Sequence, residues 1–161
     1  MQWVSTQLPG IINMSIGGSK SEIVNRLVKT MTSRGWKFVV AAGNDNQNAC
    51  NYSPASAVEA LTVGAIDATN RVPSFSNYGQ CVDMLAPGDS VLSAYPNGLL
   101  AYMSGTSMAS PIVAGIWSLY PQARQADVLR MGLLNRVFKP PAATVNRIAY
   151  APSVNNANNC E

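Results

Sequence analysis

The 161-residue sequence contains no histidine. Imidazole is the side chain whose ordinary pKa suits it to proton transfer at neutral pH, and it is also a frequent zinc ligand. The absence excludes every mechanism that takes a histidine base from these residues. It also excludes every metal site that needs a histidine ligand from them.

Charged residues are scarce, at 12% against 47% hydrophobic residues, and the formal net charge is only +3. This composition excludes a disordered polyelectrolyte and favours one globular domain with its own core. The lysines and arginines are scattered, so we expect no nucleic-acid partner. No apolar run approaches the ~20 residues of a membrane helix and the N-terminal residues lack the pattern of a secretory signal, so we expect no membrane partner.

The three cysteines, Cys50, Cys81 and Cys160, are an odd number. Three free thiols would suit a cytosolic protein, whereas one bridge with a spare thiol would suit an exported one. Composition alone leaves both arrangements open.

The first forty residues predict a strand, a helix and a second strand. Residues 11–16 are an apolar run that favours a buried strand. Ser19 and Glu22 have the spacing of a capping box, and Gly35 marks the end of the helix that follows. Residues 38–42 then suit a strand that is buried on both faces. This βαβ unit favours a parallel sheet with right-handed crossovers.

The rest of the chain predicts further strands and two helices. Residues 106–120 leave almost no polar face, so we expect a central helix that is buried on all sides. The fold class is therefore α/β, with three layers and a mostly parallel sheet around a buried central helix. The other expected elements are a surface loop at 45–57, strands at 61–66, 82–85 and 91–94 with a turn at 87–88, and an amphipathic helix at 126–134.

Ser107 lies at the start of the predicted central helix. A serine in this place can be an N-cap, or it can be a nucleophile whose oxyanion is stabilised by the free N–H groups of the helix. The spacing alone leaves both readings open. The nucleophile is favoured by Asn44, because the strand at 38–42 delivers this amide to the sheet edge where open α/β sheets bind ligands.

Several segments resemble the subtilisin-type serine proteases, and within them the proteinase K and aqualysin-like branch. They follow in order along the chain, at residues 13–18, 41–44, 51–56, 74–79 and 105–111. The resemblance implies a subtilisin-like fold and serine endopeptidase activity through an acyl-enzyme, with a peptide or protein as substrate. It covers only the C-terminal portion of such a catalytic domain. Residues 1–154 are interpreted as that portion, incomplete on its N-terminal side, and residues 155–161 as an Asn-rich tail.

The resemblance assigns catalytic roles to two residues. Ser107 would be the nucleophile, with its backbone N–H as one oxyanion donor, and Asn44 would be the side-chain donor. In subtilisin itself the loss of such a donor lowers kcat by about 10²–10³, and we take this magnitude over from there. Substrate would pair as a strand with one segment and place a side chain against another. These segments are Ser15, Ile16 and Gly17 for the pairing, and Ala41, Ala42 and Gly43 for the pocket.

The resemblance also implies a structural calcium ion, while catalysis would need no cofactor. The carboxylate of Asp83 and the backbone carbonyls of Val58 and Ala60 would hold the ion, and oxygen ligands suit a hard cation. The alternative is that Asp83 only makes local hydrogen bonds.

By the same resemblance Cys50 and Cys81 form a disulfide, and Cys160 stays unpaired. Closing a loop of about 30 residues stabilises a fold by roughly 3–4 kcal/mol in the chain-entropy treatment. A disulfide would imply an extracellular or secreted parent protein.

The sequence departs from the family in its catalytic groups. The aspartate and histidine of the triad precede the serine in the family, and neither Asp45 nor Asp67 stands at a matching position. Ile112 stands where the family motif usually has histidine. Without a base Ser107 is an unactivated alcohol, and in subtilisin loss of the triad lowers kcat by about 10⁶. A Ser-Lys dyad is disfavoured because no lysine has a sequence reason to approach Ser107, and a sedolisin-like site would carry aspartate where Asn44 stands.

Three functional hypotheses remain. The chain is a portion of a serine endopeptidase and is inactive alone, or it is a non-catalytic peptide-binding module derived from a protease, or a separate N-terminal half-domain completes it. In each case we expect apolar faces that this chain alone leaves uncovered.

Overall fold

The computed structural model describes residues 6–152 of the chain. Its main sheet has six strands in the order β1-β3-β5-β6-β10-β9, and every neighbouring pair is parallel except β10 and β9. The prediction of a mostly parallel sheet is therefore confirmed. The strands are β1 (Ile11–Met14), β3 (Lys37–Ala41), β5 (Ala60–Ile66), β6 (Met84–Pro87), β9 (Leu133–Leu134) and β10 (Arg147–Ile148).

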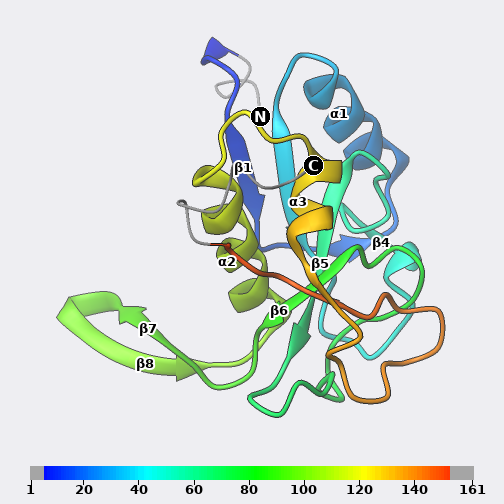
Figure 1. Cartoon of the computed structure of the whole chain (residues 1–161). Coiled ribbons are helices and arrows are strands. Elements are labelled where there is room, and N and C mark those ends of the chain that lie inside the picture. The colour runs from blue at the N-terminus through cyan, green and yellow to red at the C-terminus, as the bar shows by residue number, and fades with distance from the viewer. Residues whose placement is uncertain (1–5, 153–161) are drawn as a thin grey trace.

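The remaining described strands form two small sheets of two strands each. One joins β2 (Gly18–Ser19) to β4 (Tyr52–Ser53), and the other is a hairpin of β7 (Val91–Tyr95) and β8 (Leu99–Met103). Figure 1 shows that the β7–β8 hairpin projects away from the body of the molecule.

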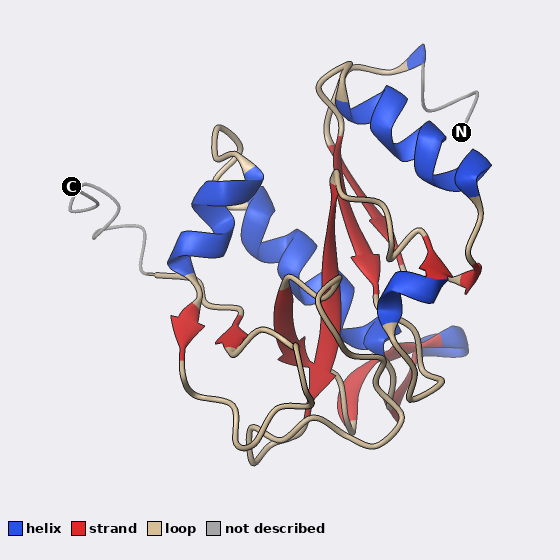
Figure 2. Cartoon of the chain, turned by 90° about the vertical axis from the view of Figure 1, so that its right-hand side faces the viewer, coloured by secondary structure: helices blue, strands red, loops and turns tan. Residues whose placement is uncertain are grey.

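Helices cover both faces of the main sheet, so the fold has three layers (Figure 2). Helix α1 (Glu22–Thr32) packs on one face, and α2 (Thr106–Ser118) with α3 (Gln125–Met131) packs on the other. Two short 3-10 turns, η2 (Ala49–Asn51) and η3 (Pro96–Gly98), lie in the connections. Between residues 6 and 152 the structure contains no helix that is both long and apolar enough to span a membrane.

Strand β3 shows why the sheet is buried on both sides. Val39 packs with Val113 and Trp117 of α2, whereas Phe38 and Val40 join a cluster with residues of α1. Successive side chains of a strand point to opposite faces, so an unbroken apolar run fills both cores. The two-sided burial predicted for residues 38–42 is confirmed.

The predicted start of the first helix is wrong. The side chain of Ser21, not of Ser19, caps α1 by accepting a hydrogen bond from the N–H of Val24 at 3.4 Å. Ser19 instead belongs to β2, where it pairs with Tyr52 of β4. This pairing of distant segments carries no local sequence signal, which also explains why residues 45–57 were predicted as a plain loop. The first strand ends at Met14 and not at residue 16.

Two further predictions need correction in the second half of the chain. The helix predicted at 126–134 is α3, which ends at Met131, and Leu133–Leu134 form β9. Gly132 lies between them, and a Cβ at this position would lie 2.6 Å from Cγ of Arg147 in β10. The strand predicted at 82–85 is β6 and includes Pro87, which was predicted to lie in a turn. Strand β8 was missed.

The prediction that the central helix is buried on all sides is wrong. Ala109, Val113 and Trp117 of α2 are buried against the sheet, whereas Pro111 and Gly115 are exposed. The helix is apolar all round, but within the described residues only one of its sides has a neighbouring layer.

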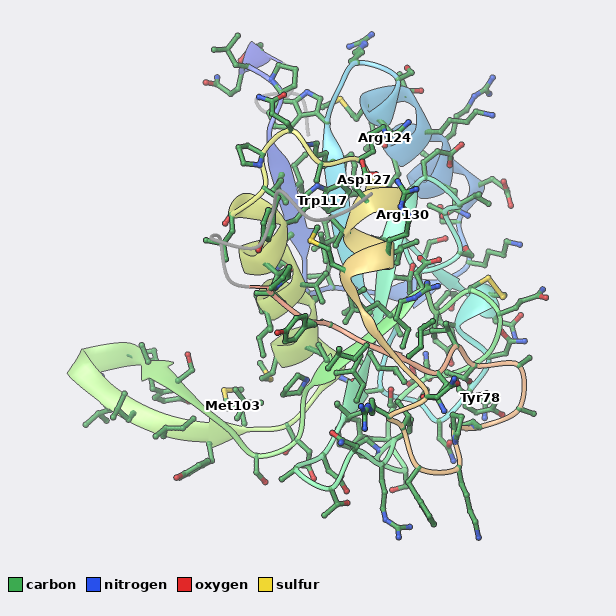
Figure 3. The ribbon with its side chains drawn as sticks, viewed as in Figure 1. Tyr78, Met103, Trp117, Arg124, Asp127 and Arg130 are labelled. Atoms are coloured by element: carbon green, nitrogen blue, oxygen red, sulfur yellow. A yellow bond between two sulfur atoms is a disulfide. The ribbon has the colours of Figure 1, made fainter. Side chains whose placement is uncertain are left out.

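The exposed side of α2 is continuous with other uncovered apolar surface. The hairpin carries Leu100 at 69% and Tyr102 at 71% exposure. A groove of about 350 Å³ separates it from α2, and Met103 and Ile112 line this groove. Figure 3 shows Met103 on the hairpin. Strand β1 is the outer strand of the sheet and pairs only with β3 among the described residues. We use the term uncovered face for three parts together. They are the outer side of α2 with Pro111 and Gly115, the β7–β8 hairpin (residues 91–103), and the free edge of β1 (Ile11–Met14).

Candidate active site

A cleft of about 520 Å³ lies where β1 and β3 end and α2 begins. This is the carboxyl edge of the parallel strands, where ligands of open α/β sheets bind. The cleft brings together every residue to which the sequence assigned a catalytic or substrate-binding role. They are Ser15, Ile16, Gly17, Ala41, Ala42, Gly43, Asn44 and Ser107.

The side chain of Asn44 has one defined orientation. Its Oδ1 accepts hydrogen bonds from the backbone N–H and from the hydroxyl of Thr106, at 2.8 and 2.9 Å. A backbone N–H can only donate, so the atom facing it must be the amide oxygen. The Nδ2 group lies beside Gly105, where an added Cβ would be 3.2 Å from it, and it makes no hydrogen bond within residues 6–152. Asn44 thus keeps its N–H donors free for a ligand in the cleft.

Thr106 is a residue that sequence reasoning missed. It is fully buried, and its hydroxyl donates to Asn44 and accepts the N–H of Gly43 at 3.1 Å. Thr106 is part of the motif around Ser107, but its contact with Asn44 joins residues that are 62 positions apart in the sequence. Only the folded structure shows this contact.

We expect Thr106→Val to destabilise the fold, although valine has nearly the same shape. The change leaves the N–H of Gly43 without its partner, and a buried unsatisfied group costs about 1–3 kcal/mol. Urea unfolding followed by circular dichroism measures the loss. Thr30→Val is the matched control, because the exposed hydroxyl of Thr30 bonds only the carbonyl of Arg26 in its own helix. Equal stabilities of the two variants would contradict the role given to Thr106.

Ser107 is not the N-cap of α2. The helix begins at Thr106, and Gly105 occupies the cap position with φ +153 and no side-chain bond. The hydroxyl of Ser107 donates to the carbonyl of Ser15 at 3.3 Å, and the hydroxyl of Ser15 donates to the carbonyl of Ser107 at 2.9 Å. A carbonyl cannot take up a proton at neutral pH, so the described residues hold the Ser107 hydroxyl in place without activating it.

Residues 15–17 leave a backbone edge open. They lie between β1 and β2, pair with no strand among the described residues, and form one wall of the cleft, with Ile16 64% exposed. The Ser15 carbonyl accepts the Ser107 hydroxyl, but the segment has no backbone pairing with another strand, and an open edge of this kind beside a cleft can add an extended peptide as a further strand.

Of the residues predicted to hold calcium, Val58 precedes β5, Ala60 begins it, and Asp83 directly precedes the neighbouring strand β6. Oδ2 of Asp83 accepts the N–H of Thr62 at 2.8 Å, two residues along the strand from Ala60. Burial raises the pKa of Asp83 to about 6, against the lowering effects of this hydrogen bond and of Arg147. Val58 is 89% exposed. In the part of the chain that is described, no group of three His, Cys, Asp or Glu side chains could hold a metal ion.

Cys50 and Cys81 form a disulfide, with their Cα atoms 5.3 Å apart. The bond joins η2, which follows the loop of Asn44, to the segment before β6. Cys160 and the tail at 155–161 lie outside the described residues.

The fold and the cleft are those of a subtilisin-like serine proteinase. The structure resembles the crystal structure of a cold-adapted subtilisin-like serine proteinase with a TM-score of 0.88 and 36% identity, over 94% of this chain and 59% of that one. The profile of the Subtilase family matches residues 1–139. The chain belongs to the subtilase family.

Curated relatives agree with this assignment. The chain is 48% identical to the alkaline proteinase of Hapsidospora chrysogena over 86% of its own length and 37% of the relative. It is 47% identical to the extracellular serine proteinase of Thermus sp. (strain Rt41A), over 96% of its own length and 39% of the relative. These fungal and Thermus relatives confirm the predicted resemblance to the proteinase K and aqualysin-like branch. The chain spans well under half the length of these two relatives.

Proposed function

We propose that this chain carries the nucleophile and the oxyanion site of a subtilisin-like endopeptidase, and that it works only with an aspartate and a histidine from outside the 161 residues. The observation that carries the proposal is the cleft, which joins Ser107, the free amide donor of Asn44 and the open edge of residues 15–17. The sequence contains no histidine to serve as base.

In the proposed reaction a peptide pairs with residues 15–17 and places its scissile carbonyl beside Ser107. The Ser107 oxygen attacks the carbonyl carbon while the supplied histidine takes its proton. The oxyanion that forms accepts hydrogen bonds from Nδ2 of Asn44 and from the N–H of Ser107. Histidine then passes the proton to the leaving amine, and water hydrolyses the acyl-enzyme.

The uncovered face supports the need for further residues. It begins directly beside the nucleophile, because Ser107 lines both the cleft and the groove between α2 and the hairpin. A layer packed there would bury the exposed side of α2 and bring its own side chains to Ser107. The relatives are much longer than this chain, so their additional residues could form such a layer.

A peptide-binding module without chemistry is the second candidate. The hydrogen bond from Ser107 to the Ser15 carbonyl favours it, because this is a resting state that needs no base. Reconstitution with a segment that supplies aspartate and histidine separates the candidates. Turnover that depends on Ser107 supports the peptidase, and peptide binding without turnover supports the module.

We also propose a structural calcium ion bound by Asp83 with the carbonyls of Val58 and Ala60. Support for this donor set comes from Oδ1 of Asp83, which has no hydrogen-bond partner among the described residues. Arg147 is close enough to lower the pKa of this carboxyl, and the Ala60 carbonyl also accepts Nε2 of Gln125 at 3.3 Å, so the ion would compete with both groups. Oxygen ligands of this kind suit calcium. The ion would tie the loop before β5 to the segment before β6.

Calcium should therefore raise the thermal unfolding midpoint of the chain. Binding to the folded state alone adds about 2.7 kcal/mol at a hundredfold excess over Kd. Scanning calorimetry with calcium and with a chelator measures the shift, and Asp83→Asn should abolish it. Asp67→Asn is the control, because the Asp67 carboxylate is already held by Thr69 and Arg71. A calcium shift that survives Asp83→Asn would disprove the site.

The parent protein is proposed to act outside the cell. The Cys50–Cys81 disulfide persists in oxidising compartments, and one relative is named an extracellular serine proteinase.

A further inference from the structure

Asn77 is a buried polar residue that none of the proposed catalytic steps uses. It lies in the segment between β5 and β6, its side chain is 0% exposed, and its amide makes three hydrogen bonds. Oδ1 accepts the N–H groups of Asp45 and Gln47, at 3.0 and 2.9 Å, and Nδ2 donates to the carbonyl of Ala42 at 2.9 Å. All three partners belong to residues 42–47, which we call the oxyanion loop because it contains Asn44.

The oxyanion loop is shaped around this side chain. Gly43 has φ +104, and a Cβ at this position would lie 2.3 Å from Nδ2 of Asn77. The backbone N–H of Asn77 also donates to the carbonyl of Gly43 at 2.9 Å. Glycine is thus required at position 43 both for its backbone conformation and for the space that the Asn77 amide fills.

Asn44 is consequently held from two sides. Thr106 bonds its side-chain oxygen, and Asn77 fixes the backbone immediately before and after it. Oxyanion stabilisation depends on donors that are already in place before charge develops. A loop that moves about 1 Å would lose much of the effect, since displacements of this size cost up to 10²-fold in rate.

We infer that Asn77 is a positioning residue for the oxyanion site, which acts by holding the loop that presents Nδ2 of Asn44. The inference rests on the proposed function, because it assigns Asn77 to the same oxyanion. It gives the buried amide a role beyond filling the core.

The test compares a tetrapeptide aldehyde with the corresponding peptide alcohol, using the full chain. The Ser107 oxygen can add to the carbonyl carbon of the aldehyde while its proton passes to the carbonyl oxygen, so a neutral hemiacetal forms without a base and places that oxygen at the Asn44 donor; the alcohol cannot react in this way. We expect the unsubstituted chain, called the parent in these comparisons, to bind the aldehyde more tightly than the alcohol. Asn77→Ala should reduce this preference by about tenfold or more, because the Asn44 donor would be misplaced. A merely structural role would weaken both ligands together and leave the preference unchanged, which would overturn the inference.

Asn146→Ala is the matched control. The Asn146 amide also pins a backbone segment, with Oδ1 accepting the N–H of Val137 and Nδ2 donating to its carbonyl, but it does not line the cleft. This variant should keep the aldehyde preference of the parent. Asn77→Asp guards against unfolding of the alanine variant, because its Oδ1 can still accept the N–H groups of Asp45 and Gln47, while the hydrogen bond to the Ala42 carbonyl is lost. It should keep more of the preference than Asn77→Ala.

Amide hydrogen exchange separates this inference from the proposed function. Asn77→Ala should speed exchange at Asp45 and Gln47 and shift the side-chain NMR signals of Asn44, whereas Asn146→Ala should do neither. If the parent shows no aldehyde preference, the proposed oxyanion site fails while the exchange data still decide whether Asn77 holds the loop. Unchanged Asn44 signals in Asn77→Ala would reject the positioning role.

Discussion

Mixing this chain with a segment that supplies the aspartate and the histidine is expected to produce peptidase activity that neither part has alone. The cleft already contains Ser107, the free amide of Asn44 and the open edge of residues 15–17, so under the proposed function the added groups supply only the proton transfer. In subtilisin, from which we take the magnitude, losing the triad lowers kcat by about 10⁶. The gain on mixing should be a large part of this factor. The part of the Thermus relative that precedes the matched region is a suitable segment, and release of a chromophore from a peptide measures the rate.

Two serine variants sharpen this experiment. Ser107→Ala should abolish the activity of the mixture, while Ser118→Ala, at the exposed far end of the same helix, should leave it unchanged. Ordinary protease rates from the 161-residue chain alone, lost in Ser107→Ala, would show that the predicted dependence on an external histidine is wrong. A mixture that binds peptide but never turns over would favour the module.

The sequence predicted the parts of the fold whose signals are local. The apolar run at 38–42 became β3, and Gly35 has the positive φ expected after α1. The strand at 61–66 is β5, with its start one residue earlier. Each of these elements is specified by residues that are neighbours in the chain, which is why single-sequence reasoning reaches them.

Elements that depend on distant partners escaped prediction. Strands β2, β4, β9 and β10 have only two residues each, too few for a periodic pattern. Strand β8 was missed although Asn97 and Gly98 mark a tight hairpin turn with positive φ at both residues. The side chains of β8 are mostly apolar, as in a buried strand, yet they are exposed, because the hairpin belongs to the uncovered face.

The candidate site divides in the same way. Ser107 and Asn44 could be named from motifs, but Thr106 and Asn77 hold Asn44 through contacts that span 62 and about 30 positions of the chain. The sequence also predicted the central helix to be buried all round, because its composition is apolar on every side. Within the described residues Pro111 and Gly115 of this helix are exposed, so its apolar composition alone did not predict which side is covered.

Loss of the Cys50–Cys81 disulfide should lower the stability of the fold without removing any residue of the cleft. The bond closes a loop with a sequence separation of 31, and chain-entropy arithmetic gives about 3–4 kcal/mol. For a domain of this size each kcal/mol corresponds to roughly 2–4 °C in Tm, so the double variant Cys50→Ser/Cys81→Ser should melt about 6–16 °C lower. Scanning calorimetry of the oxidised, reduced and double-variant proteins measures the shift.

The same experiment shows whether the change in Tm comes from the Cys50–Cys81 bond or from another effect of the reductant on thiols. Cys160→Ser leaves the pair intact and should melt with the parent under both conditions, whereas the double variant should no longer respond to reductant. Mass spectrometry after thiol blocking gives an independent check, because three alkylated cysteines in the unreduced protein would rule the bond out. The loop that the bond closes contains β4, the partner of β2, which follows directly on the substrate edge. Reduction should therefore also weaken binding of an extended peptide, in proportion to the loss of order at residues 15–17.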